Sequence, residues 1–400
     1  MTNKQRVVIL GAGFGGIKTA KLLKPLQRRG LIELALVDRR DYFLFTPLLP
    51  ELIFGRLRSD EVAIPLVSLL DKRTTFYHQE IIAVDLERRQ VRLKKTILTF
   101  DILVIATGAK ADIFFPAESS RIYKFQDIDD ALRLSDKIEK ALLLASQESD
   151  EQRRRQLLSF AVLGAGPTGV ELAAHIQEQL LNQQKHFLSA GSHLRDNEFS
   201  VKLISRGQEI LASFPAWMRA EARKCFDKIG VEIIFNSLAE SLSPRGIVLQ
   251  NGQEIMAENI IWAAGLKAQT PEFLGNQPVA VNGRLEITPE LLMKGHRNVL
   301  CLGDSSCLLV NGGPLPGLAQ VANQQAVVAA RNIEALVLNK PLRPFVYKHR
   351  GEFLTLGKKS ALGNLWGWHL RSRLARIFWA LIYCIKVPSL KTKRRLPRYL

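Results

Sequence analysis

The sequence predicts an α/β protein with two Rossmann-like dinucleotide-binding domains, because it contains two strand, glycine turn and helix motifs. The first motif combines an apolar run at residues 6–10 with a glycine turn at residues 11–16 and a following helix. The second repeats this order with an apolar run at 159–163 and a turn at 164–169. A continuous apolar run is typical of a parallel strand that is buried on both faces. Two copies of the whole motif therefore predict two nucleotide sites in one chain.

Each glycine turn lets the backbone approach a pyrophosphate, and the helix that follows supplies amide donors. In the first motif, Asp38 ends the next strand, where a carboxylate binds ribose hydroxyls. In the second motif, the corresponding strand is followed by Ser205 and Arg206. A Ser beside an Arg accepts the 2′-phosphate that an acid repels, which favours NADPH. Two alternatives stay open: Arg206 only faces solvent, or Glu209 restores a preference for NADH.

The formal net charge of +18 is concentrated at the C-terminal end. Residues 341–400 contain fourteen Lys or Arg and one acid, a net charge of +13, against +5 for the first 340 residues. Apolar residues recur there at helical spacing, with Arg373 and Arg376 away from them. Such a helix, with cationic flanks, is suited to an anionic membrane surface; the open alternative is packing on the body or on a second subunit. The expected apolar face comprises Trp366, Leu370, Leu374, Ile377, Phe378, Leu381, Ile382 and Ile385, with Trp368, Trp379 and Tyr383 as further aromatic surface.

Several classes of function are disfavoured. Cys225, Cys301, Cys307 and Cys384 form no CxxC pair and no metal-ligand spacing, so we expect no metal site and no disulfide reductase. No apolar run reaches the roughly 18 residues of a transmembrane helix. No recognition module for nucleic acid accompanies the basic tail. We therefore expect a protein that lies on the cytoplasmic side of a membrane without spanning it, and that binds no nucleic acid.

The chain resembles the flavoproteins with two dinucleotide-binding domains and, among them, the type II NAD(P)H:quinone oxidoreductases. The resemblance covers nearly the whole chain and includes both turns, Asp38, the segment at 43–49 and the AQxAxQ motif at 319–324. The AQxAxQ motif separates these enzymes from their relatives. The segment at 351–357 is most similar to the cyanobacterial and plastid branch, which reduces demethylphylloquinone.

The resemblance implies an FAD domain that an NAD(P)H domain interrupts. Residues 1–126 and 276–340 then form the FAD domain, residues 127–275 the NAD(P)H domain with a helical connector at 127–158, and residues 341–400 a tail for membrane association or dimerisation. The implied FAD residues are Gly11, Gly13, Phe14, Gly15, Gly16, Asp38, Arg39, Thr46, Pro47, Ile81 (through its backbone), Ala106, Thr107, Gly108, Gly303, Asp304, Ala319 and Gln320. The implied NAD(P)H residues are Gly164, Gly166, Pro167, Thr168, Gly169, Glu171, Ser205, Arg206, Ala264 and Gly265.

Three residues are candidates for catalysis. Gln320 and Gln324 are four residues apart and share one face of a predicted helix at 318–338, where uncharged amides can hydrogen-bond quinone carbonyls. The alternative is a polar helix face turned to water. Glu171 follows the second turn, and the resemblance implies a position near the nicotinamide and the flavin. The alternative is a carboxylate that only interacts with the helix dipole.

The sequence thus predicts a peripheral-membrane FAD oxidoreductase. The resemblance implies hydride transfer from NAD(P)H to FAD and then two electrons to a lipid quinone, a naphthoquinone such as demethylphylloquinone or plastoquinone, without proton pumping. One alternative is a flavin- and NAD(P)H-binding redox sensor or interaction protein. The other is an enzyme like sulfide:quinone oxidoreductase, for whose paired cysteines the sequence has no evident equivalent. The C-terminal segment is also a candidate homodimer contact.

Overall fold

The computed structural model describes residues 4–113, 121–189, 195, 198–275, 281–310 and 312–396. The chain divides into two compact units. Unit 1 comprises Met1–Leu44, Ala63–Lys110 and Leu266–His349, and unit 2 comprises Phe45–Val62, Ala111–Gly265 and Arg350–Leu400. The sequence places breaks at 126, 275 and 340, whereas the units change at 110, 265 and 349. Two pieces remote in sequence, Phe45–Val62 and Arg350–Leu400, belong with the second glycine turn.

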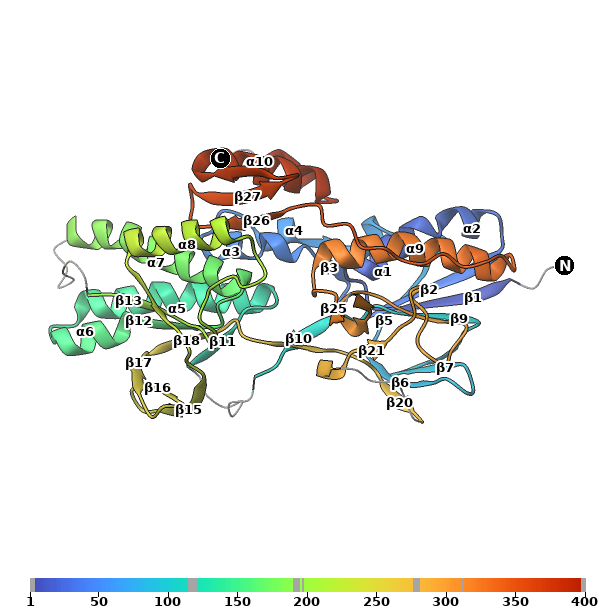
Figure 1. The fold of residues 1–400 in the computed structure, drawn as a ribbon, viewed down its shortest axis with the longest axis horizontal. Helices are drawn as coiled ribbons and strands as arrows, with labels where there is room; N and C mark the ends of the chain where they lie inside the picture. The colour runs from blue at the N-terminus through green and yellow to red at the C-terminus, as the bar shows by residue number, and fades with distance from the viewer. Residues whose placement is uncertain are drawn as a thin grey trace. The chain divides into compact units, whose positions relative to one another are not determined.

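Unit 1 contains a five-stranded parallel sheet in the order β22-β9-β1-β2-β5. Its central strand β1 is apolar because it is covered on both faces, and Val7 to Leu10 have no exposed surface. Helices α1 and α9 lie side by side (Figure 1). The elements are β1 (Gln5–Leu10), α1 (Phe14–Leu22), α2 (Lys24–Arg28), β2 (Ile32–Asp38), β3 (Tyr42–Leu44), β4 (Ala63–Pro65), η2 (Leu66–Ser68), β5 (Thr75–His78), β6 (Ile81–Asp85), β7 (Gln90–Leu93), β8 (Ile97–Thr99), β9 (Ile102–Ile105), β10 (Ala109–Ala111), β19 (Leu266–Ala268), β20 (Glu272–Leu274), η3 (Val281–Gly283), β21 (Leu285–Glu286), β22 (Val299–Cys301), η4 (Gly303–Ser305), β23 (Ser306–Cys307), β24 (Leu309–Val310), β25 (Gly313–Pro314) and α9 (Ala319–Val337).

Unit 2 contains a second five-stranded parallel sheet, in the order β11-β18-β12-β13-β14. Its central strand β12 is again buried along its whole length. Both sheets therefore confirm the Rossmann-like α/β fold. The elements are η1 (Thr46–Leu48), α3 (Pro50–Ile53), α4 (Ser59–Val62), β11 (Ile122–Lys124), α5 (Ile128–Gln147), α6 (Glu151–Leu157), β12 (Ser159–Leu163), α7 (Pro167–Ser189), β13 (Ser200–Ile204), α8 (Ala216–Ile229), β14 (Val231–Ile234), β15 (Ala239–Ser243), β16 (Gly246–Leu249), β17 (Glu254–Met256), β18 (Asn259–Trp262), β26 (Glu352–Thr355), β27 (Ala361–Leu365), β28 (Trp368–Arg371), α10 (Ser372–Lys386) and α11 (Leu390–Arg395).

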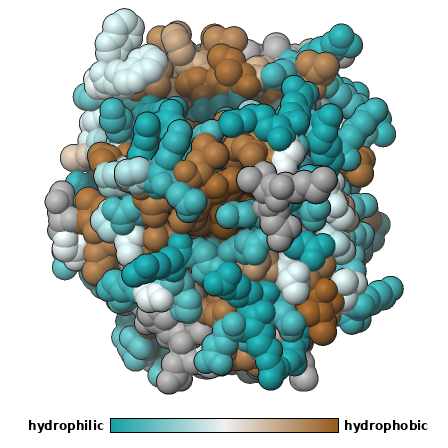
Figure 2. All heavy atoms as spheres, turned by 90° about the vertical axis from the view of Figure 1, so that its right-hand side faces the viewer, coloured by the Kyte–Doolittle hydropathy of each residue, from teal (hydrophilic) through white to brown (hydrophobic). Residues whose placement is uncertain are grey.

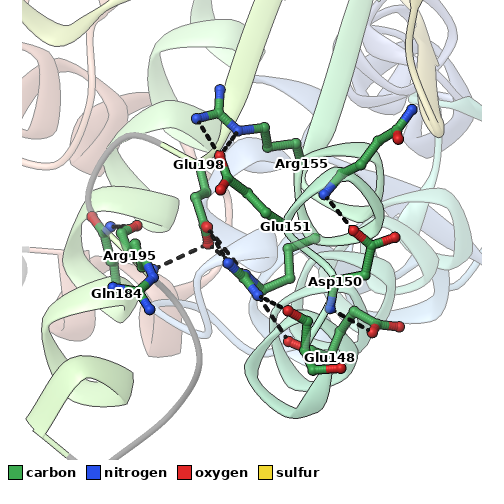
Figure 3. Close-up of polar contacts among 10 residues, drawn as sticks. Glu148, Asp150, Glu151, Arg155, Gln184, Arg195 and Glu198 are labelled. Carbon is green, nitrogen blue, oxygen red and sulfur yellow. Dashed lines mark hydrogen bonds and ion pairs between the residues drawn. The ribbon is translucent and has the colours of Figure 1, made fainter.

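The predicted connector at 127–158 is helical and consists of α5 and α6. The side chain of Asp127 caps α5 by accepting the N–H of Asp130 at 2.9 Å. At α6, the buried Arg154 donates to Glu198, with Nη2 2.6 Å from Oε1 and Nε 2.9 Å from Oε2. Figure 3 shows this cluster, in which Arg195 N–H also donates to Glu198. The ion pair fixes Glu198 against α6. The sequence predicts a surface excursion at 184–198, of which residues 190–194, 196 and 197 lie outside the described residues.

The C-terminal segment differs from the predicted tail in where its helix begins. Residues 352–371 form an antiparallel meander, β26-β27-β28, which precedes α10 and α11. In Figure 1 this meander lies directly beneath α10. Trp366 therefore lies at an exposed turn and Leu370 in a buried strand position, and neither belongs to the helix.

A face of α10 that the sequence did not predict is buried. It consists of Ala375, Arg376, Trp379 and Ala380, whereas Leu374, Ile377, Leu381 and Ile385 are exposed. The prediction that Arg376 and Trp379 lie on the surface is wrong. The reason is that Arg376 has a buried acid partner, which periodicity alone does not reveal.

Candidate cofactor and catalytic sites

The first glycine turn is closely packed on one side and open on the other. Gly11 has a φ of +98°, and a Cβ there would lie 2.4 Å from the carbonyl oxygen of Ala106. A Cβ on Gly16 would lie 1.8 Å from the carbonyl oxygen of Gly11. At Gly13 a Cβ would meet nothing within 4 Å. The turn thus needs glycine to bring helix and strand together and leaves space beside Gly13, as a pyrophosphate requires.

Asp38 is held in place at the carboxyl end of β2. Its Oδ2 accepts the N–H of Ala12 at 2.7 Å, and its Oδ1 accepts the N–H of Arg40 at 2.9 Å. The carbonyl oxygen of Asp38 accepts the N–H of Gln79 at 3.0 Å, two residues before Ile81. The structure therefore holds Asp38 beside the turn, with Arg39 next to it, whereas Ile81 begins β6 in a neighbouring sheet, two residues after Gln79.

The remaining predicted FAD residues of unit 1 follow two neighbouring strands, β9 and β22. Thr107 Oγ1 is buried without a hydrogen-bond partner among the described residues, which fits a hydroxyl that bonds a ligand. Gly303 donates its N–H to the side chain of Gln325 at 2.7 Å. Burial raises the pKa of Asp304, and the nearby Arg284 opposes this effect. These residues fit FAD: an open turn, a ribose-binding acid and an unsatisfied hydroxyl.

Gln320 and Gln324 lie in the first turns of α9, as expected, and Ala319 begins the helix. The side chain of Gln324 is engaged with the backbone of Lys348: its Nε2 donates to the Lys348 carbonyl at 2.8 Å, and its Oε1 accepts the Lys348 N–H at 3.1 Å. A bond from Gln324 to a quinone would therefore replace an existing internal bond. The role of Gln320 toward a quinone stays a prediction.

The second glycine turn repeats the geometry of the first. Gly164 has a φ of +109°, and a Cβ on Gly169 would lie 1.8 Å from the carbonyl oxygen of Gly164. A Cβ on Gly166 would meet nothing within 4 Å. Pro167 and Thr168 begin α7, and a proline is favoured at this position because it needs no N–H partner. Ala264 and Gly265 follow β18, whose end packs on Gly164.

The end of β13 differs from the end of β2. Ser205 is buried, and its hydroxyl donates to the carbonyl oxygens of Gly207 at 3.1 Å and Glu209 at 3.3 Å. Glu209 is paired with Arg219, with Oε2 2.8 Å from Nη1. Arg206 is exposed and forms no ion pair with a residue that the structure describes. The open turn and this cationic rim fit a nicotinamide dinucleotide.

Glu171 lies at the start of α7 and contacts the C-terminal segment of the same unit. Its Oε1 accepts two hydrogen bonds from Thr355, from the backbone N–H and from Oγ1, both at 2.8 Å. Thr355 Oγ1 also lies 3.1 Å from His175 Nε2. Burial raises the pKa of Glu171 to about 7 and lowers the pKa of His175 to about 3.

A buried ion cluster lies behind these residues. Arg376 Nη2 is 2.6 Å from Glu51 Oε1, and Arg56 Nη1 is 3.1 Å from Glu51 Oε2. Burial raises the pKa of Glu51, but the charges of Arg376 and Arg56 outweigh it, so the carboxyl stays ionised. The ring of His175 stacks on Phe54 at 5.1 Å between centroids. The cluster joins α10 to the segment that carries Thr46 and Pro47, which also belong to unit 2.

Sequence reasoning missed Thr355, His175, Glu51, Arg376 and Gln325. Thr355 belongs to the 351–357 segment that carried part of the resemblance, and Gln325 follows the AQxAxQ motif directly. Both residues could have been chosen as candidates from the sequence. Glu51 and Arg376 are 325 residues apart, and nothing local to either one indicates the partner.

Comparison with known proteins identifies the family. The profile of the pyridine nucleotide-disulphide oxidoreductases matches residues 5–326. Ndh of Mycobacterium tuberculosis, a type II NADH:quinone oxidoreductase, is 30% identical over 98% of this chain and 86% of its own length. This chain belongs to the type II NADH:quinone oxidoreductases. It is an oxidoreductase and flavoprotein whose cofactors are FAD and NAD(P)H.

Two further comparisons agree. The demethylphylloquinone reductase NdbB of Synechocystis is 29% identical over 96% of this chain and 93% of its own length. The structure of NDH2 from Plasmodium falciparum in complex with NADH matches with a TM-score of 0.86 at 22% identity, over 99% of this chain and 97% of that one. The structural match shows the fold.

None of the described helices is both long and apolar enough to cross a membrane. In the same ranges, no three or more His, Cys, Asp or Glu side chains gather in a way that could hold a metal ion.

Proposed function

We propose that this chain is a peripheral-membrane flavoenzyme that passes two electrons from NAD(P)H, through FAD, to a lipid quinone. The observation that carries the proposal is the pair of equivalent open glycine turns, one in each unit, in a member of this family. FAD supplies the hydride acceptor and the two-electron donor when it is bound. Residues around Gly13, Asp38 and Thr107 would hold FAD, and residues around Gly166 and Ser205 would hold NAD(P)H. Gln320 and Glu171 are the proposed contacts of the reacting groups.

The experiment is a two-step stopped-flow measurement on the holoenzyme. NADPH is expected to bleach the flavin absorbance, and a naphthoquinone is expected to restore it. Demethylphylloquinone analogues and plastoquinone analogues are compared, since the Synechocystis relative is named for the former. A flavin that NADPH reduces but no quinone reoxidises would overturn the enzyme proposal in favour of a redox sensor.

NADPH is the proposed donor, because the end of β13 carries the neutral Ser205 and the cationic Arg206 instead of a carboxylate. Arg206 is exposed and without an acid partner among the described residues, whereas Glu209 is engaged by Arg219 at 2.8 Å. A free guanidinium attracts a 2′-phosphate, and a paired carboxylate repels it less than a free one. Steady-state turnover with NADH and NADPH at matched concentrations tests this preference.

An anionic lipid surface, on the cytoplasmic side, is the proposed partner of α10. Leu374, Ile377, Leu381 and Ile385 form an exposed row at helical spacing, and Arg373 adjoins it. Figure 2 shows hydrophobic side chains gathered on one face of the molecule. Exposure alone does not single out this helix, because Val67, Ile97 and Leu309, which lie outside it, are exposed too. The combination of the row with the +13 charge of the tail supports the proposal. Lys391 and Arg395 contribute less, because they are paired with Asp60 and Glu61.

Liposome flotation tests the lipid partner. Leu381→Glu is expected to release the protein from vesicles that contain phosphatidylglycerol, and Leu144→Glu, at an exposed leucine of α5, is the matched control. Equal flotation of both variants would contradict the lipid surface, and conversion of a dimer to a monomer by Leu381→Glu would assign the face to a second subunit. Truncation after Leu362 is a poor test, because it removes the buried Arg376.

A further inference from the structure

Thr355 constrains one oxygen of the Glu171 carboxyl in both protonation states. The backbone N–H of Thr355 can only donate, so Oε1, at 2.8 Å, must accept. In a neutral carboxyl the carbonyl oxygen is the better acceptor, because the other oxygen carries the proton and its lone pairs are less basic. Oε1 is therefore the acceptor oxygen whether Glu171 is ionised or neutral, and the exchangeable proton belongs to Oε2.

The hydroxyl of Thr355 links Glu171 to His175, because its Oγ1 contacts both side chains. If Oγ1 gives its one proton to Glu171 Oε1, its lone pairs face His175 Nε2 at 3.1 Å. His175 must then be the Nε2–H tautomer, with Nδ1 unprotonated. Nδ1 is buried and has no hydrogen-bond partner among the described residues, and a lone pair left unpaired costs less than an unpaired N–H. The order His175, Thr355, Glu171 is thus a directed chain of donors.

We propose that Thr355 is a positioning residue whose hydroxyl, donating to the same oxygen as its backbone N–H, holds Glu171 Oε1 as an acceptor, so that Oε2 is the atom that takes up and releases the proton needed for quinone reduction. The inference rests on the proposed function. Reduction of a quinone to a quinol consumes two electrons and two protons. The hydride of NAD(P)H supplies both electrons and one proton, and the second is a solvent proton, carried by hydronium or a buffer acid. In this proposal Glu171 Oε2 takes up that solvent proton, gives it to the reduced quinone and is then reprotonated from the solvent.

The surroundings of Glu171 keep such a proton exchangeable near neutral pH. Burial raises the pKa of Glu171 to about 7, and the two Thr355 bonds oppose this effect. From α3, Glu51 raises the pKa, and from α10, Arg376 lowers it. On α7 itself, His175 is neutral because burial lowers its pKa to about 3. Tyr383 of α10 also stays neutral, because burial and Glu171 raise its pKa.

The test compares Thr355→Val, which removes the hydroxyl, with Thr355→Ser, which keeps it. Thr355→Ala is the second variant without a hydroxyl, in case the valine does not fold. Thr392→Val is the matched control, because Thr392 is equally buried in unit 2 and its hydroxyl donates to the Glu61 carbonyl at 2.7 Å. Glu171→Gln identifies the infrared band of the Glu171 carboxyl, because that band is absent in this variant.

The first readout does not depend on turnover. The infrared carbonyl stretch of a protonated carboxyl, assigned by its loss in Glu171→Gln, is followed as a function of pH in the holoenzyme. Loss of the Thr355 hydroxyl removes a hydrogen bond to the ionised form, so the midpoint is expected to rise by about one pH unit. Thr355→Ser and Thr392→Val are expected to keep the wild-type midpoint.

The second readout is the pH dependence of flavin reoxidation by quinone, which is expected to shift by the same amount. An unchanged infrared midpoint in Thr355→Val and Thr355→Ala would overturn the positioning role, whatever the enzyme does with quinone. An infrared shift without a matching shift in reoxidation would overturn the role of Glu171 as proton donor. If the wild-type flavin is not reoxidised by any quinone, the proposed function fails, and the infrared midpoints still decide whether Thr355 fixes Glu171.

Discussion

The two glycine turns have the same backbone and different chemistry. In both, a Cβ on the last glycine would lie 1.8 Å from the carbonyl oxygen of the first. Two residues beyond that glycine, unit 1 has the exposed Lys18 and unit 2 has Glu171, which is bonded to Thr355. At the end of the next strand, unit 1 has Asp38 and unit 2 has Ser205. The shared backbone explains why both units are suited to a dinucleotide, and the differing side chains define what each unit can do with it.

The largest expected effect concerns the ion pair that ties the C-terminal segment to unit 2. Arg376→Leu leaves the buried Glu51 charge without its closest partner, and removing one member of a buried pair costs about 3–5 kcal/mol. Unfolding in urea measures the loss. Lys18→Leu, in the other unit, is expected to change stability by less than about 0.5 kcal/mol. A loss below about 1 kcal/mol in Arg376→Leu would show that the cluster around Glu51 does not anchor the segment.

The next largest effect shows which cofactor each glycine turn binds. Gly16→Ala is expected to abolish FAD retention, because its methyl group overlaps the Gly11 carbonyl oxygen. Gly169→Ala is expected to retain FAD and to bind NAD(P)H at least 100-fold more weakly, about 2.7 kcal/mol. Flavin absorbance and flavin reduction by NADPH report the two losses. Gly313→Ala, where a Cβ meets nothing within 4 Å, is the control. Loss of FAD in Gly169→Ala would reverse the assignment of the units.

The third effect is a dependence of the free energy of unfolding on pH, which comes from His175 in helix α7. The folded pKa of His175 is about 3, below its ordinary 6.5, so its contribution to stability is complete above about pH 6.5 and is lost as pH falls toward 3. The slope is up to about 1.4 kcal/mol per pH unit. Glu171 has the opposite sign, since stability falls as pH rises from 4.5 to about 7. The contribution of His175 is therefore measured in the Glu171→Gln background, in which the opposing contribution of Glu171 is absent.

Urea midpoints between acid and neutral pH measure the slope in that background. The double variant Glu171→Gln and His175→Gln is expected to lose most of it. Replacement of the exposed His78 of unit 1 by Gln is the matched control and is expected to leave the slope unchanged. An identical acid slope with and without His175 would contradict the buried neutral imidazole.

The smallest expected effect comes from giving the end of β13 the acid that ends β2. Ser205→Glu places an acid where Asp38 stands in unit 1, and it is expected to raise KM for NADPH about tenfold, or about 1.4 kcal/mol, with little change for NADH. Arg206→Ala is expected to act in the same direction. Equal changes in KM for both nucleotides would show that neither side chain reads the 2′-phosphate.

The sequence was sufficient for features that are local. The two sheets, the turns, the position of Asp38 and the helix that carries Gln320 follow from runs and spacings of fewer than 30 residues. The C-terminal helix was predicted, but its expected apolar face began at Trp366 and Leu370, which lie in a turn and a strand before α10. Its buried side was not predicted, because that side includes Arg376, and an arginine is assigned to solvent unless a buried acid is known to meet it. That acid, Glu51, lies in a segment that the glycine motifs do not cover. The same reason conceals Thr355, whose role depends on Glu171 in a distant part of the chain.

The bond between Arg376 and Glu51 has a consequence for how the protein is made. The two residues are separated by 325 positions. At about 5–20 residues per second, a ribosome needs roughly 16–65 s to reach Arg376 after it has added Glu51. During that interval the nascent chain holds an acid that has no partner from α10. A product that ends before Arg376 therefore contains both glycine turns and a second unit in which Glu51 lacks this partner.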